Sequence, residues 1–211
     1  NGGSQHASSV TISGSKIIYQ HDDSESVVDT VRYELNDGGI ANGSFLDTSF
    51  VVITIAPIND NAPSLILDTM TVSEADTNGH TIGEIQYQDV DGDRAVISIL
   101  TQEYDGAFVI VNDSVFQVAD SSLIDHEVDN LHWVEVQLSD GLNVSTDTLW
   151  VKVLNVNDNA PKIANTEFTM AEGEPNGYDV GNLNATDADG GILIYSIVNQ
   201  EYSGAFSLDS N

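Results

Sequence analysis

The chain has 211 residues, of which 34 are aspartate or glutamate and only five are lysine or arginine, so its formal net charge is -29. This excess of negative charge argues against nucleic acid and anionic membrane surfaces as partners and favours cations. The sequence has no cysteine, no apolar run long enough to cross a bilayer and no signal peptide. We therefore expect a chain that does not itself span a membrane and is stabilised by core packing or bound metal rather than by disulfides.

The sequence repeats itself at an interval of 98 residues, because the run Asn-Asp-Asn-Ala-Pro occurs at 59–63 and again at 157–161. When residues 64–113 are aligned on 162–211 without a gap, 16 of the 50 positions are identical. A repeat of this size indicates tandem domains. The predicted units are the C-terminal half of a repeat at 1–63, a complete repeat at 64–161 and the N-terminal half of a repeat at 162–211.

The complete repeat has the periodicity of short β-strands. Apolar and polar residues alternate within 131–141 and 146–156, which predicts two half-buried strands. Five more candidates, separated by Gly, Asn and Asp turn signals, are 65–72, 81–88, 95–101, 106–111 and 115–119. No stretch has convincing helical spacing. About seven short strands in one repeat predict an all-β fold of tandem immunoglobulin-like Greek-key sandwiches.

The acidic residues of the complete repeat lie at predicted strand ends and in turns. They are Glu74, Asp89, Asp91, Asp125, Glu127, Asp140 and Asp158. Because successive turns of a sandwich alternate between its two ends, we expect one acidic cluster at each end. Crowded carboxylates repel one another, and five basic residues cannot neutralise them. Ca²⁺, which takes six to eight oxygen ligands, is therefore the predicted cofactor.

The order Glu, Asp-x-Asp, Asp-x-Glu, Asp-Gly and Asn-Asp-Asn-Ala-Pro resembles the cadherin repeat, in the cysteine-free form found in bacterial extracellular adhesins. The first half-repeat, with "IIYQHDDSESVVDTVRYELNDGG", is also similar to the repeats of chondroitin sulphate proteoglycans. The resemblance covers all three units. It implies that Ca²⁺ binds at the junctions, with ligands from the preceding repeat, the linker and the following repeat.

The resemblance implies a ligand set for each junction. For the first junction these are Asp23, Glu25, Ile58 (through its carbonyl), Asn59, Asp60, Asn61, Asp89, Asp91 and Asp140. For the second they are Glu74, Asp125, Glu127, Val156 (through its carbonyl), Asn157, Asp158, Asn159, Asp187 and Asp189. The family usually has Asp two residues before Asn-Asp-Asn, where this chain has Pro57 and Asn155, so we expect a weakened ion site there.

The two half-repeats lead to a hypothesis about assembly. Either the chain is a window from a longer array, or it is a filament subunit whose ends form a composite sandwich with neighbouring copies, head to tail. In the second case Glu172 would serve the first junction of the next copy. Asp37 would then take, at the second junction, the role that Asp140 has at the first.

The function expected from these observations is an extracellular or cell-surface structural and adhesive module, in which Ca²⁺ fixes the repeats as a rod. Its partners would be neighbouring repeats or copies, with a cell-surface or glycan ligand as a further candidate. The alternatives are a calcium-dependent carbohydrate-binding module and a homophilic cell-adhesion domain. An enzyme is not expected, because the acidic pairs recur with the repeat, whereas catalytic residues normally occur once.

Two further residue types carry weaker signals. The five histidines share no metal-ligand spacing, so we expect them in turns or facing solvent. Glycosylation sequons begin at Asn42, Asn112, Asn143 and Asn184, and they matter only if the source glycosylates its proteins.

Overall fold

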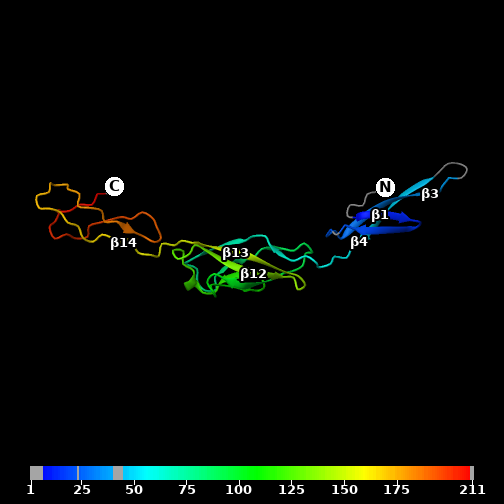
Figure 1. Ribbon diagram of the computed structural model, residues 1–211, viewed down its shortest axis with the longest axis horizontal. Coiled ribbons are helices and arrows are strands. Elements are labelled where there is room, and N and C mark those ends of the chain that lie inside the picture. The colour runs from blue at the N-terminus through cyan, green and yellow to red at the C-terminus, as the bar shows by residue number, and fades with distance from the viewer. Residues whose placement is uncertain (1–6, 23, 40–44, 210–211) are drawn as a thin grey trace.

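The computed structural model describes residues 7–22, 24–39 and 45–209. Its parts lie in a row along the long axis (Figure 1): an N-terminal lobe at 7–63, a central lobe at 64–161 and a C-terminal lobe at 162–209. In the described ranges the regular structure consists of strands, apart from one 3₁₀ turn, η1 (Ser121–Leu123). The predicted all-β class is confirmed. Within the same ranges no helix is long and apolar enough to span a lipid bilayer.

The central lobe is a sandwich of two sheets. The larger sheet has the order β6 (Thr69–Ser73), β13 (Val144–Leu154), β12 (Leu131–Ser139) and β9 (Val96–Gln102). The smaller sheet has the order β10 (Phe108–Val111), β11 (Val115–Val118) and β7 (Thr81–Glu84). A short pair, β5 (Ser64–Leu65) with β8 (Tyr87–Gln88), lies next to the first linker in sequence. All pairs are antiparallel except β13 with β6, which is parallel.

The core of the central lobe comes from the alternation seen in the sequence. Val134, Val136 and Leu138 on β12 are fully buried, and Leu149 and Val151 on β13 are buried beside them. The side chains between these positions are less buried, as expected for a sheet with one face toward the core. The buried cluster extends across both sheets and closes the sandwich.

His132 contradicts the expectation that the histidines face solvent or lie in turns. It is 1% exposed, and its ring packs against Tyr104 and Phe108 at centroid distances of 4.8 and 5.9 Å. The physical reason is its register, because position 132 belongs to the same inward row of β12 as Val134 and Val136.

The outer lobes repeat parts of the central lobe in their backbone pairing. In the N-terminal lobe β1 (Ala7–Ser13) pairs with β2 (Lys16–His21), and β3 (Val28–Asn36) pairs with β4 (Leu46–Thr54). The β3–β4 register matches that of β12–β13, since Leu35 lies opposite Asp47 as Leu138 lies opposite Ser145.

The C-terminal lobe keeps the pairing of the first half of the repeat. Its β14 (Lys162–Ile163) pairs with β15 (Ala185–Thr186) in the register of β5 with β8, shifted by 98 residues. The Gln200 side-chain amide bonds the backbone of Phe206, just as Gln102 bonds Phe108. This strand pair and this side-chain contact therefore recur in the central and C-terminal lobes at the interval of 98 residues.

The variant Leu149→Ala is expected to lower the free energy of unfolding of the central lobe by about 2–5 kcal/mol, because it leaves a cavity in a closed core. Both tryptophans of the chain, Trp133 and Trp150, lie in this lobe, so their fluorescence during urea titration reports it selectively. Leu142→Ala, at an exposed turn position, is the matched control and should change stability by less than about 0.5 kcal/mol. Equal losses in the two variants would contradict the proposed core.

Candidate metal centre

The first junction is organised by the carboxylate of Asp91, which lies in the turn after β8. One of its oxygens accepts the backbone N–H groups of Asp60 and Asn61, at 3.0 and 2.8 Å. Its other oxygen accepts the side-chain amide of Asn61 at 3.0 Å. These bonds, chiefly that from the Asn61 backbone, lower the pKa of Asp91 below its usual value. A charged carboxylate of the central lobe is thereby fixed against the linker.

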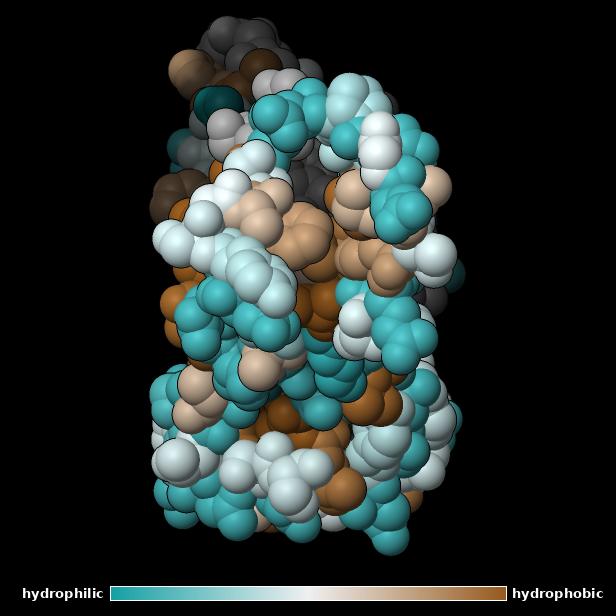
Figure 2. Space-filling model, turned by 90° about the vertical axis from the view of Figure 1, so that its left-hand side faces the viewer, coloured by the Kyte–Doolittle hydropathy of each residue, from teal (hydrophilic) through white to brown (hydrophobic). Residues whose placement is uncertain are grey.

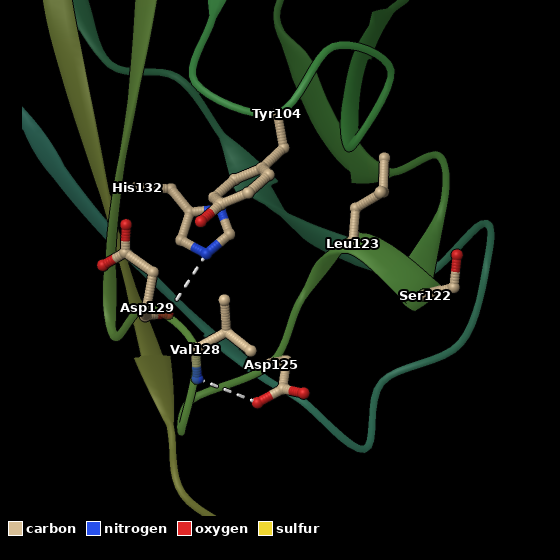
Figure 3. A pocket seen from close by; sticks show the side chains of 7 residues that line it. All are labelled: Tyr104, Ser122, Leu123, Asp125, Val128, Asp129 and His132. Carbon is tan, nitrogen blue, oxygen red and sulfur yellow. Dashed lines mark hydrogen bonds between the residues drawn. The ribbon is translucent and has the colours of Figure 1, made fainter.

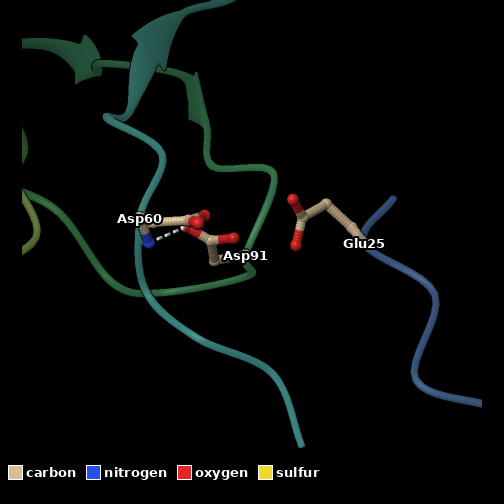
Figure 4. Close-up of side chains that lie close together, drawn as sticks. All are labelled: Glu25, Asp60 and Asp91. Carbon is tan, nitrogen blue, oxygen red and sulfur yellow. Dashed lines mark hydrogen bonds between the residues drawn. The ribbon is translucent and has the colours of Figure 1, made fainter. Parts of the chain in front are cut away.

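Three carboxylates from three parts of the chain meet at this junction. Glu25 comes from the segment between β2 and β3, Asp60 from the linker and Asp91 from the central lobe, and their oxygens lie within 4.8 Å of one another. Figure 4 shows Glu25 pointing toward the other two from the opposite side. The side-chain amide of Asn61 donates to both Glu25 and Asp60, at 3.0 Å each. One amide group therefore bridges all three carboxylates.

The Asp-x-Asp turn beside this junction leaves one carboxylate oxygen without a partner. Oδ1 of Asp89 accepts the backbone N–H groups of Asp91 and Gly92, at 2.8 and 3.1 Å. Oδ2 of Asp89 is buried and has no hydrogen-bond partner in the described part of the chain. Asp89, Asp91 and Asp93 also form a second oxygen cluster within 4.8 Å. A buried, unpartnered carboxylate oxygen in such a cluster fits a bound cation.

The second junction has the same design, built from the equivalent residues. Asp189 accepts the backbone N–H of Asn159 at 2.7 Å and its side-chain amide at 2.8 Å. That amide also donates to Glu127 at 3.1 Å and to Asp158 at 2.9 Å. The side-chain bond from Asn159 is the main cause of the lowered pKa of Asp189. Glu127, Asp158 and Asp189 again lie within 4.8 Å of one another.

A further acidic group at the second junction involves Glu74, which directly follows β6. Its carboxylate accepts the backbone N–H of His126 at 2.7 Å and that of Val156 in the linker. Glu74, Asp125 and Glu127 lie within 4.8 Å of one another, as the sequence predicts for one end of the sandwich. Burial, followed by the negative charge of Glu74 and other nearby acids, raises the pKa of Asp158. A cation at this position would relieve that repulsion.

The loop that carries Asp125 and Glu127 is anchored to the core through His132 (Figure 3). Oδ1 of Asp125 accepts the N–H groups of Glu127 and Val128 at 3.0 and 3.1 Å, and Nε2 of His132 lies 3.2 Å from the carbonyl oxygen of Asp129. A cavity of about 130 Å³ lies behind the loop. Its lining consists of Tyr104, Ser122, Leu123, Asp125, Val128, Asp129 and His132. The buried histidine therefore helps to set the position of two candidate ligands.

Asn143 was missed as a site residue, because the sequence marked it only as a sequon. Its side-chain amide donates to Oδ1 of Asn59 at 2.6 Å and lies 3.3 Å from Oδ2 of Asp140. Asp140 accepts the Asn143 backbone N–H at 2.6 Å, which is the main cause of its lowered pKa. Asp140 thus reaches the first linker through Asn143.

Asn155 stands where the resemblance to the cadherin repeat leads us to expect Asp, and its side chain makes a hydrogen bond. Its side-chain amide donates to the backbone carbonyl of Asp189 at 3.0 Å, which ties the linker to the C-terminal lobe. A carboxylate could not donate this bond. The expectation of a weaker ion site at this position stays a prediction.

The remaining predicted ligands differ in how closely they approach the acidic groups. Ile58, Asn59, Val156 and Asn157 lie in the linkers, and Asp187 accepts the N–H of Asp189 at 3.0 Å. Asp37 and Glu172 are in none of the acidic groups found in the described ranges: Asp37 accepts the N–H of Phe45 beyond β3, and Glu172 is exposed in the C-terminal lobe. Asp23 lies outside the described residues.

Comparisons with known proteins agree with this architecture, although no protein-family model matches the chain. Mouse cadherin-related family member 2 is 31% identical over 174 residues, which is 76% of this chain and 13% of that protein. Mouse protocadherin Fat 4 is 29% identical over 194 residues, which is 86% of this chain and 4% of that protein. The chain therefore spans only a small part of the length of these relatives.

Solved structures of cadherin domains are also similar to this chain in fold. Extracellular cadherin domains 3–6 of protocadherin gamma B2 match 89% of this chain and 51% of their own, with a TM-score of 0.60 at 20% identity. Domains EC3–6 of protocadherin gamma B7 match 83% of this chain and 46% of their own, with a TM-score of 0.59 at 20% identity. The chain has a cadherin-like fold.

The variant Asn143→Ala is expected to loosen the first linker while leaving the second unchanged, because only the first linker receives the Asn143 amide. The lost bonds correspond to about 0.5–1.5 kcal/mol. Amide hydrogen exchange should therefore become faster at 59–61 and remain the same at 157–159. Asn130→Ala, at an exposed position, is the matched control. Unchanged exchange at 59–61 would show that Asn143 does not hold the linker.

Proposed function

We propose that this chain is part of an extracellular adhesive array of cadherin-like repeats, in which Ca²⁺ bound at the junctions fixes each lobe relative to the next. The supporting observation is that both linkers carry the same arrangement. In each, an acid of the preceding lobe, the Asp of the linker and an Asp of the following lobe lie within 4.8 Å. An arrangement that recurs once per repeat suits a structural role better than catalysis.

The ligand chemistry supports calcium over other metals. The clustered groups are carboxylates, with amide and carbonyl oxygens nearby in the linkers, and the chain has no cysteine. Hard oxygen donors of this kind favour Ca²⁺ and Mg²⁺ over zinc or copper. Calcium also tolerates the irregular, many-ligand geometry that flexible linkers provide.

The residues of the junctions explain how ion binding would stiffen the array. At the first junction Glu25, Asp60 and Asp91 would hold the ion, with Asp89 supplying its unpartnered oxygen. Bound calcium supplies the positive charge that lets these carboxylates remain close together. Because the ligands belong to two lobes and the linker, holding them together also fixes the angle between the lobes.

An extracellular location and adhesion follow from the same proposal. Extracellular calcium modules typically have dissociation constants of about 10⁻⁴–10⁻³ M, so such junctions would be filled outside a cell and empty inside it. Homophilic adhesion is consistent with the cadherin-like relatives. The resemblance to bacterial adhesins and to chondroitin sulphate proteoglycan repeats stays a prediction, as does a glycan ligand.

Stiffening can be measured across the second junction by single-molecule energy transfer, since the chain has no native cysteine. Dyes at Thr101→Cys in the central lobe and Thr166→Cys in the C-terminal lobe occupy exposed positions. We expect a narrow distribution of transfer efficiency in Ca²⁺ and a broad one in chelator, because the acids then repel one another. Identical distributions in the two conditions would argue against the calcium-dependent rod.

The variant Asp158→Asn is expected to weaken calcium binding at the second junction about tenfold or more, because it removes one anionic ligand from the cluster. Isothermal titration calorimetry would count the sites and measure each affinity. Asp105→Asn, which removes the same charge at an exposed loop position, should change the affinities by less than about twofold. Equal effects of both variants would indicate general electrostatic attraction rather than a site.

A further inference from the structure

On one side of the central lobe, both sheets end in a strand with a free edge. β9 is the last strand of the larger sheet and β10 is the last strand of the smaller one, and in the described ranges no further strand pairs with either. A groove of about 340 Å³ runs between them. Its lining consists of Ile97, Ser98, Ile99, Leu100, Thr101, Gln102, Asp105, Phe108, Val109 and Ile110. The groove therefore follows the length of β9 and has an elongated shape.

This groove, which we call the β9–β10 groove, differs from the other apolar surfaces of the molecule. On the opposite side of the sandwich a methyl group placed on Gly83 of β7 would lie 2.7 Å from Cε of Met70 on β6, so the methionine side chain fills the gap between the sheets there. Figure 2 shows apolar atoms at the C-terminal end of the molecule, but that lobe holds only the first half of a repeat. The β9–β10 groove belongs to the complete repeat, both halves of which are described.

The free edge of β9 has backbone groups that can pair with a further strand. Ile97 donates its N–H away from β12, to the carbonyl oxygen of Asp113 at 2.8 Å. Because the backbone groups of a strand point to the same edge at every second residue, those of Ile99 also face the groove. The register with β12 shifts just after Ile99, where Leu100 has no residue opposite it, and Leu100 is 48% exposed. The edge therefore offers a backbone donor, a backbone acceptor and an apolar side chain.

The edge of β10 already pairs with an amide group at one point. The side-chain amide of Gln102 donates to the carbonyl oxygen of Phe108 at 3.3 Å and accepts the Phe108 N–H at 3.0 Å, as the backbone of a neighbouring strand would. By the same alternation the backbone groups of Ile110, two residues further on, also face the groove. An extended segment that lies in the groove beyond Gln102 can therefore continue this pairing.

The two strands that border the groove carry no charged side chain. β9 has the sequence VISILTQ and β10 has the sequence FVIV, in a chain with 34 acidic residues. Charged side chains are a common means of keeping an edge strand from pairing with another chain, and β9 lacks them. Among the residues that line the groove, only Asp105 is charged. It lies in the loop that connects β9 to β10, so the negative charge is at one end of the groove.

We propose that the β9–β10 groove binds an extended segment of a partner protein, which pairs with the free edge of β9 as an additional strand. The segment carries apolar side chains at alternate positions, because one row of its side chains faces the groove, and a lysine or arginine at the end that reaches Asp105. A second copy of this chain is disfavoured as the occupant, because two chains of net charge -29 repel each other. None of the lining residues is a predicted calcium ligand, so this binding is separate from the proposed function.

A panel of synthetic peptides tests the groove by calorimetry with the full chain. In each peptide valine, leucine, isoleucine or phenylalanine alternates with threonine, and one end carries lysine or glutamate. We expect the best lysine peptides to bind with dissociation constants below about 100 μM, and their glutamate counterparts at least about threefold more weakly. The same peptides with every backbone amide N-methylated keep their side chains but have no backbone donor, and they should not bind. If no peptide of the panel binds at about 1 mM, the proposal is overturned.

Amide hydrogen exchange, measured by NMR, locates the bound peptide. Exchange should slow at Ile99 and Ile110 when the peptide binds, because their N–H groups face the groove. Exchange in β6, the opposite edge of the larger sheet, should remain unchanged. A peptide that slows exchange in β6, or that binds and leaves Ile99 unaffected, would contradict strand addition to β9.

Two pairs of variants test the residues of the groove. Leu100→Glu places a negative charge on the free edge and should weaken peptide binding at least about tenfold, whereas Leu142→Glu, at an exposed turn position, should leave it unchanged. Asp105→Lys should reverse the preference for lysine over glutamate peptides, whereas Asp147→Lys, at an exposed position of β13, should preserve it. Equal effects within the first pair would place the binding elsewhere. A preference that Asp105→Lys does not reverse would overturn the pairing of the basic residue with Asp105.

Sedimentation velocity without peptide distinguishes a separate partner from a second copy. The wild type and Leu100→Glu should sediment alike, because the groove is not expected to hold a second copy of the chain. Self-association of the wild type that Leu100→Glu abolishes would identify a second copy as the occupant and overturn the proposal of a separate partner.

Discussion

The structure depends on how two asparagine side chains hold carboxylates of like charge. The amide nitrogens of Asn61 and Asn159 each lie within hydrogen-bond distance of three carboxylates, one from the lobe before, one from the linker and one from the lobe after, so their two N–H groups are shared among the three. Aspartate in either position would remove the donor and add a fourth negative charge. The relative placement of neighbouring lobes therefore depends on a neutral side chain at the centre of each acidic cluster.

Much of the fold can be predicted from the sequence because both the alternation of apolar and polar residues and the repeat are visible in it. The alternation around Val134 and Val136 predicts β12 and its inward face, and the 98-residue repeat predicts the equivalent pairs β5–β8 and β14–β15. His132 shows the limit of reasoning from residue type, since its place in the inward row outweighs its polarity. Once a strand's register is known, the row to which a residue belongs is a better guide to burial than its chemical class.

The residues of the candidate metal centre also include some that the sequence analysis identified and one that it did not. The grouping of Glu74, Asp125 and Glu127 was implied by the resemblance to cadherin repeats, whereas the positions of the strand ends predicted only that acidic residues would gather at the ends of the sandwich. Asn143 could not be predicted, because its bond to Asn59 spans 84 residues and depends on how the β12–β13 turn meets the linker. Its contribution comes from the shape of that turn, in which Asp140 accepts the Asn143 backbone N–H, rather than from a motif of its own.

The position of Asn143 also bears on covalent modification. The nitrogen that a glycan would occupy is the one that lies within 3.4 Å of four oxygen atoms, which belong to Asn59, Asn61 and Asp140. Asn143, Val144 and Ser145 form a complete acceptor sequence, and a sugar on that nitrogen would replace one of the two hydrogens that make these contacts. Glycosylation of Asn143 would therefore compete with the contact between the first linker and the β12–β13 turn.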